Sequence, residues 1–474
     1  MPRGLPLYHP GLIADLYHPD AAYVAWRTGH RGLATFDLYA RQAPFGGAYL
    51  LAAGLEPALE FLQAFHYEDD DLEFLAQIRD YDPAFLDYLR HLRFSGEVLA
   101  VREGTVCFPN EPLLRVTAPY VEALLIESGL LQAINAGTLI ATKAARIVWA
   151  ARGRSVAEFA LRRALEPYVV ARSSYIGGAA STSFLAAAFR YRLRATGSIP
   201  HALVQLFDNE EEAFRAVAET FSRYTLLLDT YDPRRAIHTA VRVARWAQET
   251  LGHTLAAVRL DSGDLLELSH YVRRVLDEAG FPETRILLSG DLDEFAIAEL
   301  LEAGAPVDAF GVGTALGAAS GSIEHGVSGG ALGGVYKLVW YEENGEGRPA
   351  VKIAGDKSTW PGKKRLYRVG AYERDIVMLE EEPPPAGARA LLWPVVRGGA
   401  VLPGSLPPIS EIWEHARQSL AELPEVYKQL KGAPAYPVEF SSGIYALRDR
   451  ALHSENGHLR DPAAEEAERC APSD

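Results

Sequence analysis

The stretch that decides the fold is TLLLDTYDPRRAIHTAVRVARWAQETLGHTLAAVRLDSGDLLELSHYVRRVLDEAGFPETRILLSGD, residues 225–291. It holds three short apolar runs, separated by two stretches in which apolar residues recur with helical spacing. Each helical stretch starts at an acidic residue or a proline and ends in glycine, as helix caps require. The runs repeat about every 30 residues, which is the length of a strand–helix unit.

The same alternation extends in both directions from this stretch. HALVQLF (201–207) and VDAFGVG (307–313) are predicted as further strands, with helices over 210–224 and 293–304. Continuous apolar strands indicate burial on both faces and hence a parallel sheet. An α/β barrel and a doubly wound sheet both fit, and both place the active site at the carboxyl ends of the strands.

Composition and charge narrow the functional classes. The 474 residues include 47 basic and 62 acidic side chains, a net charge of −15. This balance argues against binding to nucleic acid or to an anionic membrane, which need a broad basic surface, but not against small anionic ligands. Two distant cysteines, no signal-like N-terminus and no long apolar run lead us to expect a protein of the reducing cytoplasm.

Acidic side chains follow several of the predicted strands. Asp229, Asp261, Asp264 and Asp291 occupy such positions and could bind Mg²⁺ or sugar hydroxyls. Asp264, like Asp232, could equally be a helix N-cap. Arg259 precedes Asp261 on the same strand face, and the pair could hold a charged ligand or form a structural ion pair.

Two glycine-containing turns end consecutive strands. They are Ser289-Gly290-Asp291 and Gly311-Val312-Gly313-Thr314. Small residues let backbone amides approach an anion, and late strands of barrels commonly carry a phosphate site. The turns predict a phosphate cradle, with ordinary tight-turn glycines as the alternative.

Three further features carry candidate chemistry. His201 opens the predicted strand 201–207; a lone histidine at a strand edge is usually structural, but the exposed-looking turn before it adds some weight to a reactive imidazole. Arg162 and Arg163 suggest anion capture, although a solvated helix face explains them as well. Four of the eight lysines fall between Lys352 and Lys364, and they indicate either a loop that contacts polyphosphate or a solvated turn.

From the residues alone, the chain is predicted to be an enzyme acting on a phosphorylated sugar or a nucleotide. A Schiff-base aldolase needs a lysine on a barrel strand, and residues 155–320 contain none. Isomerase and transferase chemistry remain open.

The ordered set of motifs resembles the nicotinate phosphoribosyltransferase family. The matching segments run over about residues 8–370: ADLYHPDAAY, TFDLYARQAPFGGAYLLAAGLE, EGTVCFPNEPLLRV, INAGTLIATKAARI, EFALRRA, SYIGG, GSIPHAL, FDNEEEAFRAVAETF, LLLDTYD, VRLDSGDL, GVGT and KIAGDKSTWPGKKRLYRV. No single segment is decisive, but their order along the chain is specific.

The resemblance implies a fold of the type II phosphoribosyltransferase kind, an incomplete (β/α) barrel with an α/β sandwich domain. The sandwich is expected from residues 1–117 and 329–390, the barrel from 118–328, and a helical extension with a flexible tail from 391–474.

The resemblance also implies a reaction. Nicotinate and 5-phosphoribosyl 1-pyrophosphate (PRPP) would give nicotinate mononucleotide and pyrophosphate in NAD salvage, driven by ATP hydrolysis through a phosphohistidine. Mg²⁺ is the implied cofactor, ATP a co-substrate, and a homodimer with its active site at the interface the implied assembly; the metal ligands stay unassigned.

Individual roles are carried over by position. The expected catalytic residues are His201, Arg259 and Asp261. The expected substrate-binding residues are Asp15, Tyr17, Phe159, Arg162 and Thr182, with Tyr17 and Asp15 reaching across the dimer. The phosphate set is Ser289, Gly290, Asp291, Gly313 and Thr314, and the ATP or pyrophosphate loop carries Lys352, Lys357 and Lys363.

The sequence departs from the family pattern at two places. Leu165-Glu166-Pro167 stand where the family commonly has Gln-Gly, and Ala180 and Phe184 replace a usual carboxylate and amide. Two alternatives therefore accompany the main hypothesis: a nicotinamide phosphoribosyltransferase, and a non-catalytic nucleotide-binding homologue.

Overall fold

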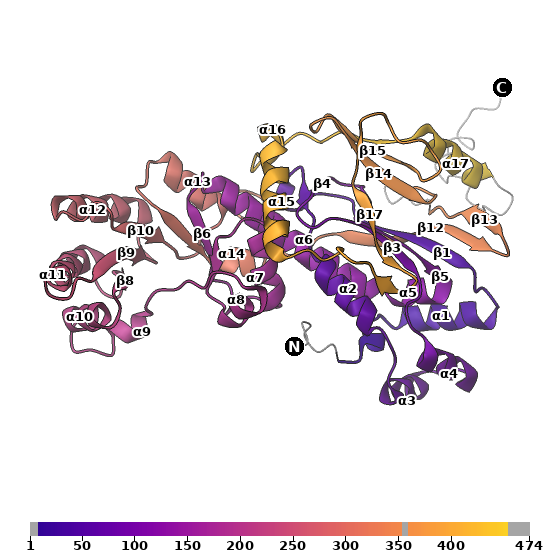
Figure 1. Cartoon of the computed structure of the whole chain (residues 1–474), viewed down its shortest axis with the longest axis horizontal. Helices are drawn as coiled ribbons and strands as arrows, with labels where there is room; N and C mark the ends of the chain where they lie inside the picture. Colours follow the sequence, from indigo (N-terminus) through magenta and orange to yellow (C-terminus); the bar gives the residue numbers. More distant parts are fainter. Residues whose placement is uncertain (1–7, 353–358, 454–474) are drawn as a thin grey trace, which may run out of the picture.

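The chain folds into two lobes that share one long helix. The computed structural model describes residues 8–352 and 359–453. Figure 1 shows a lobe of parallel strands and helices at one end and a lobe of larger sheets at the other, with α6 (Glu127–Ala150) running between them. Glu294 in the first lobe pairs with Lys143 and with Arg146 of α6, and all three side chains are buried. This buried ion triad ties the lobes together.

A seven-stranded antiparallel sheet forms the centre of the sandwich lobe. Its order is β13-β12-β1-β5-β3-β17-β18. The strands are β1 (Leu33–Ala40), β3 (Glu97–Val101), β5 (Leu114–Pro119), β12 (Gly334–Glu343), β13 (Glu346–Pro349), β17 (Leu392–Arg397) and β18 (Ala400–Val401). Strand β12 follows the barrel in sequence yet pairs with β1, so post-barrel segments complete the sandwich, as expected.

The C-terminal part adds strands as well as helices. A four-stranded sheet consists of β14 (Lys364–Val369), β15 (Arg374–Leu379), β16 (Arg389–Ala390) and β19 (Val438–Phe440), and a small sheet pairs β2 (Leu50–Leu51) with β4 (Val106–Cys107). Because β17, β18 and β19 lie beyond residue 390, that region is more than the helical extension we expected. Two helices separated at Pro424, α15 (Ile409–Glu422) and α16 (Glu425–Lys428), form the helical part of this region, and α17 (Ser442–His453) follows.

The remaining helices of this lobe are α1 (Tyr17–Arg27), α2 (Leu55–Ala64), α3 (Asp69–Ile78), α4 (Pro83–His91) and α5 (Tyr120–Leu125), with 3-10 turns at Pro10–Leu12 and Pro44–Gly46. Two of these helices begin with acidic caps. The Asp82 carboxylate accepts the backbone N–H of Ala84, and Glu68 forms a capping box with Asp71.

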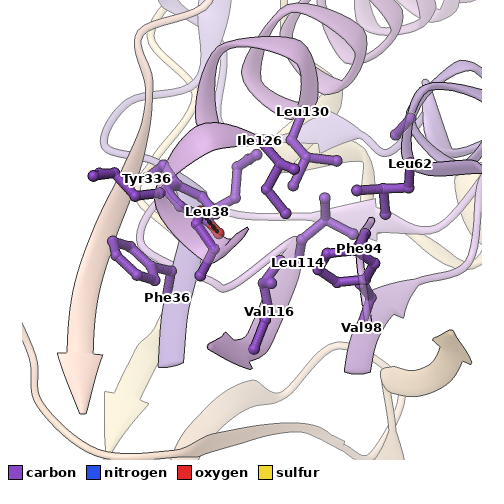
Figure 2. Packing of buried hydrophobic residues seen from close by; sticks show 14 of the residues in the cluster. Phe36, Leu38, Leu62, Phe94, Val98, Leu114, Val116, Ile126, Leu130 and Tyr336 are labelled. Atoms are coloured by element: carbon purple, nitrogen blue, oxygen red, sulfur yellow. Dashed lines mark hydrogen bonds between the residues drawn. The ribbon is translucent and has the colours of Figure 1, made fainter. Parts of the chain in front are cut away.

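The core of the sandwich lies between the seven-stranded sheet and the helices α2, α5 and α6. Figure 2 shows Val98, Leu114 and Val116 below Ile126 and Leu130, with the Phe36 ring beside Tyr336. The rings of Phe36 and Tyr336 stack with centroids 4.6 Å apart, which fixes β12 beside β1.

A sheet of six parallel strands forms the other lobe. Its order is β7-β6-β11-β10-β9-β8, and every pairing is parallel. The strands are β6 (Ser155–Glu158), β7 (Ser181–Thr182), β8 (Arg223–Leu227), β9 (Thr254–Leu260), β10 (Arg285–Leu288) and β11 (Ala309–Val312). The edge strands β7 and β8 do not pair with each other within the described residues, so the sheet curls into an incomplete barrel.

Helices connect these strands as the sequence predicts, except at one place. They are α7 (Pro167–Ile176), α8 (Leu185–Tyr191), α9 (His201–Val204), α10 (Glu210–Thr220), α11 (Pro233–Leu251), α12 (Leu265–Glu278), α13 (Glu294–Glu302) and α14 (Thr314–Gly317). The strand predicted at 201–207 is wrong: His201 begins the short helix α9 after Pro200. A short apolar run fits a helix turn as well as a strand, and only the tertiary contacts decide.

Two other sequence expectations are settled by the fold. Asp232 and Asp264 cap helices α11 and α12 by accepting the N–H groups of Arg234 and Glu267. Both residues are therefore helix N-caps, which is one of the alternatives that the sequence offered. No helix in the described parts of the chain has the length and apolar character to cross a membrane. The Cys107 thiol is free and buried.

Candidate active site

Polar side chains converge at the carboxyl ends of the parallel strands. Asp229 follows β8, Asp261 follows β9 and Ser289 follows β10, and the aromatic ring of Phe159 follows β6 beside them. Parallel pairing brings these strand ends to the same edge of the sheet. Residues about 30 apart in the sequence thereby become neighbours.

Arg259 is the centre of this cluster. Its Nε donates to Ser289 Oγ at 2.8 Å, its Nη1 to Ser198 Oγ at 3.1 Å and its Nη2 to Asp261 Oδ1 at 2.6 Å. The guanidinium also lies 5.6 Å from the centre of the Phe159 ring. One side chain therefore joins the ends of β9 and β10, the loop before α9 and the loop after β6.

Asp261 is held as a carboxylate by these neighbours. Burial works against its ionisation, but the hydrogen bond from Ser289 at 2.5 Å and the charge of Arg259 outweigh it, and the pKa of Asp261 falls below its usual value. The Ser289 hydroxyl donates to Asp261 and accepts from Arg259, so it holds both side chains in position.

His201 faces this carboxylate from the start of α9. Its Nε2 lies 3.9 Å from Asp261 Oδ2, and its Nδ1 lies 3.2 Å from Thr230 Oγ1. An Nδ1–H that donates to Thr230 leaves the Nε2 lone pair free. The imidazole is about two-fifths exposed, so a ligand can reach it.

Asp229 offers the oxygen best suited to a cation. Its Oδ2 accepts from the backbone N–H of Asp261 at 3.1 Å and from Ser262 Oγ at 2.5 Å. Its Oδ1 is buried and has no hydrogen-bond partner in residues 8–352 and 359–453. A buried carboxylate oxygen of this kind suits Mg²⁺, which prefers oxygen ligands.

The first glycine turn is shaped by close packing. A Cβ at Gly290 would lie 1.9 Å from the carbonyl oxygen of Asp261, and the φ of Gly290 is +98°. Asp291, also at positive φ, is exposed. The next helix, α13, is capped by Asp293, which accepts the N–H groups of Phe295 and Ala296, so those amides are already engaged.

The second turn is more open to an anion. Gly313 precedes α14 without a side-chain cap, and Thr314 Oγ1 accepts from Arg163. A Cβ at Gly311 would meet the Phe159 ring at 2.5 Å, so the ring rests on this glycine. Gly313 and Thr314 thus lie beside Phe159, as a shared ligand site requires.

The end of β6 carries two further candidates. Glu158 is buried and accepts from Thr182 Oγ1 and from the backbone N–H of Ala160. Burial raises the pKa of Glu158, and these two hydrogen bonds oppose that rise. Arg162 is exposed and makes no hydrogen bond or ion pair with any residue that the structure describes, so its charge is available to a ligand.

Other expected site residues lie in the second lobe. Tyr17 begins α1 and is 57% exposed, while Asp15 accepts from Ser128. Lys352 is exposed beyond β13, and Lys363 pairs with Glu342 at 3.3 Å. Figure 1 shows α1 and β13 at the opposite end of the molecule from α9–α12. Within one chain these residues do not meet His201.

Lys364 and Lys357 differ from the other lysines of this segment in what the structure shows of them. Lys364 is buried and pairs with Asp37 at 2.7 Å, so it belongs to the core of the sandwich lobe and not to a solvent-facing loop. Lys357 lies outside the described residues. The loop hypothesis therefore depends on Lys352, Lys357 and Lys363.

Three polar residues of the cluster were not among the predicted site residues. Ser198 contacts Arg259 and Thr230 contacts His201, and Asp229 was noted as a strand-end carboxylate that could bind Mg²⁺ or sugar hydroxyls but was given no assigned role. Ser198 and Thr230 lie in the segments GSIPHAL and LLLDTYD, whose likeness to the family was the available signal.

Comparison with known proteins shows the family of the chain. A family model described as the nicotinate phosphoribosyltransferase (NAPRTase) N-terminal domain matches residues 12–135. The Mycobacterium tuberculosis protein nicotinate phosphoribosyltransferase pncB2 is 39% identical, covering 94% of this chain and 94% of its own. A Bacillus subtilis nicotinate phosphoribosyltransferase is 36% identical over 96% and 98% of the two chains.

Solved structures show the same arrangement. Human nicotinic acid phosphoribosyltransferase superimposes with a TM-score of 0.82 at 30% identity and covers 92% of this chain and 99% of its own. A nicotinate-nucleotide pyrophosphorylase from Pyrococcus furiosus, at 23% identity with a TM-score of 0.71, shares the fold and covers 89% of this chain and 99% of its own.

Proposed function

This chain belongs to the nicotinate phosphoribosyltransferase family, and from that premise we propose that it joins nicotinate to PRPP, yielding nicotinate mononucleotide and pyrophosphate with ATP hydrolysis. In the transfer, the bond between the ribosyl C1 and the pyrophosphate oxygen breaks, and a bond from C1 to the pyridine nitrogen forms. The observation that carries this proposal is the cluster of His201, Arg259 and Asp261 at the mouth of the barrel.

ATP coupling is assigned to His201. Its Nε2 would attack the γ-phosphorus of ATP, the bond to the bridging oxygen would break, and ADP would leave. Thr230, at 3.2 Å from Nδ1, orients the ring for this attack. Water would later hydrolyse the phosphohistidine and release phosphate.

Arg259 and Asp261 are assigned to the ribosyl centre. The guanidinium can stabilise the negative charge that grows on the pyrophosphate oxygen, and the ionised carboxylate can face the cation-like ribosyl carbon. Ser198 and Ser289 hold the guanidinium in place at 3.1 and 2.8 Å. Preorganisation of this kind strengthens electrostatic stabilisation because no dipoles need to rearrange during the reaction.

Mg²⁺ fits beside Asp229. The unpartnered Oδ1 supports this assignment, and a bound ion would supply positive charge to the leaving pyrophosphate. The rest of the site contributes without it: Arg259 orients the pyrophosphate, and the turns at Gly290 and Gly313–Thr314 would hold the 5-phosphate.

The preference for nicotinate over nicotinamide is assigned to Arg162. Nicotinate carries a carboxylate, and Arg162, which has no partner in the described chain, follows Phe159 by three residues; the pyridine ring would lie on Phe159. Product formation with PRPP and each pyridine separately tests this choice. Turnover of nicotinamide alone would favour the alternative, a nicotinamide phosphoribosyltransferase.

The complete site is proposed to need a homodimer. Tyr17, Asp15 and the lysines of residues 352–363 would come from the second copy, since they lie at the far end of their own chain. Exposed apolar side chains near the barrel mouth support an interface there: Leu165 is 94% exposed, Leu185 72% and Phe189 81%.

A phosphorylation experiment separates the enzyme from a non-catalytic homologue. With ATP labelled at the γ-phosphate, we expect an acid-labile label on the wild-type chain and none on His201→Ala. Absence of label from the wild-type chain would contradict the ATP-coupled mechanism, and absence of nicotinate mononucleotide would contradict the transferase.

A further inference from the structure

A second cavity lies at the other end of the barrel. It has a volume of about 980 Å³ and is enclosed by the end of α6, the start of β6, the loop after α7, and helices α15 and α16. We call it the basal pocket and define it by Trp149, Arg154, Val156, Gly178, Trp413 and Lys428. Figure 1 shows α15 and α16 standing between the two lobes.

The basal pocket is separate from the catalytic cluster. Ser155 and Val156, which begin β6, line the pocket, whereas Phe159 follows the end of that strand at the barrel mouth. Ala180 lines the pocket just before β7, whereas Thr182 ends β7 on the catalytic side. The two sites therefore lie at opposite ends of the same two strands.

Lys428 is the unusual residue of the pocket. It is only 8% exposed, and its ammonium group makes no hydrogen bond or ion pair within the described parts of the chain. Its Nζ lies 4.8 Å from the ring centre of Trp149. Burial lowers the pKa of Lys428, and only the nearby charge of Glu425 opposes this. Lys428 Nζ is not among the buried atoms without a partner in the described chain, so the ammonium group faces the pocket.

A second cation in the pocket also lacks a carboxylate. Arg154 donates to the carbonyl oxygens of Val307 and Arg152, at 3.2 and 3.3 Å, and to no acidic group among the residues that are described. The other arginines are matched: Arg152 pairs with Glu302, and Arg417 pairs with Glu414. Arg154 and Lys428 are therefore the cations of the pocket without an ion pair in the described chain, and Glu425 is the carboxylate whose charge acts on Lys428.

The remaining walls are aromatic and aliphatic. Trp149 and Trp413 both line the cavity, and Trp149 is 40% exposed although tryptophan is usually well buried. Val148, Ile176, Leu420 and Leu430 add apolar surface. A volume near 1,000 Å³ with apolar walls and a few polar groups is typical of small-molecule sites.

We propose that the basal pocket is a second ligand site, which binds a small aromatic anion. The ring of the ligand lies against Trp149 and Trp413, and its anionic group pairs with Lys428 and Arg154. The negative charge of the ligand would pair with the two cations, which make no ion pair in the described chain. The two tryptophan rings favour an aromatic ligand because aromatic rings stack on one another. The proposal is independent of the reaction at the barrel mouth.

Calorimetric titration of the full chain with naphthalene-1-sulfonate tests the proposal. We expect one sulfonate per chain, and binding of the uncharged naphthalene-1-sulfonamide to be at least about tenfold weaker. Lys428→Met should weaken sulfonate binding by about the same factor and leave sulfonamide binding unchanged. The matched control is Lys431→Met, which removes an exposed lysine three positions away and should change neither.

Two further measurements keep the test decisive. Lys428→Met should keep a single cooperative thermal transition close to that of the wild-type chain, which shows that the variant folds. Arg259→Ala, at the barrel mouth, should leave sulfonate binding intact. Absence of saturable sulfonate binding, equal binding to Lys428→Met, or its loss in Arg259→Ala would each overturn the proposal.

Discussion

At the scale of single residues, Arg259 shows how the site depends on exact neighbours. Its three donors reach Ser198, Asp261 and Ser289, each on a different loop. A lysine could satisfy only part of this set, because an ammonium group lacks the planar fork of the guanidinium.

The first prediction concerns His201. His201→Ala should abolish ATP hydrolysis stimulated by PRPP and nicotinate, while a slower transfer from PRPP to nicotinate remains, because Arg259 and Asp261 are untouched. Initial rates of ADP and of nicotinate mononucleotide formation measure the two processes. Unchanged coupling of ATP hydrolysis to transfer in this variant would exclude His201 as the nucleophile.

The second prediction concerns Gly290. Gly290→Ala should lower kcat/KM for PRPP by about tenfold or more, because the new Cβ would displace Asp261 and because alanine is strained at a φ of +98°. Gly304→Ala is the matched control: Gly304 has a φ of +82°, but nothing lies within 4 Å of its Cβ position. Steady-state kinetics on both variants separate the close contact from the backbone strain they share.

The third prediction concerns the dependence of stability on pH. Burial, and then the charge of Asp232, raise the pKa of Glu210 to about 7, and its Oε1 is buried without a hydrogen-bond partner in the described chain. The folded state therefore binds a proton that the unfolded state releases, so Glu210 lowers stability as the pH rises from about 4.5 to 7.

Glu210→Gln should remove this loss. We expect the variant to be more stable than the wild-type chain at pH 8 and to match it near pH 5, as measured by urea unfolding. Glu249→Gln, on an exposed face of α11, should reproduce the wild-type profile. A wild-type profile in Glu210→Gln would disprove the assignment.

At the scale of elements, a buried ion pair holds the two sheets of the sandwich lobe together. Lys364 of β14 donates to Asp37 of β1 at 2.7 Å and to the carbonyl oxygen of Gly362 at 3.0 Å. The first contact joins residues 327 positions apart, so it pins post-barrel chain to the first strand.

The fourth prediction follows from this pair. Asp37→Asn should destabilise the protein by about 3–5 kcal/mol, because it leaves the Lys364 charge buried without a counter-ion. Lys363→Met, which breaks the part-exposed pair with Glu342, should cost at most about 1 kcal/mol. Denaturant unfolding measures both, and equal effects would contradict the role of burial.

At the scale of the whole molecule, Tyr17 and His201 lie in different lobes, at opposite ends of one chain. A single chain therefore cannot bring these two proposed site residues together. The fifth prediction is that two inactive variants complement each other when mixed and allowed to exchange subunits. If Tyr17→Ala and His201→Ala each lose coupled activity, random heterodimers should restore about a quarter of the wild-type rate, since half of the dimers would carry one intact site out of two. No recovery after verified exchange would exclude a shared site.

The sequence by itself predicted the strands and helices of the barrel lobe wherever the local pattern allowed one interpretation. The strands at 225–227, 255–260, 285–288 and 309–312, with the helices between them, follow from apolar runs of strand length bounded by caps, and the structure confirms them. The sequence also indicated that Asp261 and Ser289 lie together, because parallel strands place their carboxyl ends at one edge, and the structure confirms that they are neighbours; their roles stay predictions. The net charge of −15 argues against extended polyanions as ligands, which also stays a prediction, and the family resemblance is confirmed.

Only the tertiary structure decided the conformation of residues 201–207, the burial of Lys364 and the existence of the basal pocket. The apolar run at 201–207 fits a strand or a helix turn, and packing after Pro200 selects the helix. Lys364 resembles its neighbouring lysines in sequence, but β-pairing buries it against Asp37. The basal pocket brings Trp149 and Lys428 together from elements 279 positions apart. Local propensity and periodicity specify elements, whereas long-range packing determines which charges find partners and which remain for a ligand.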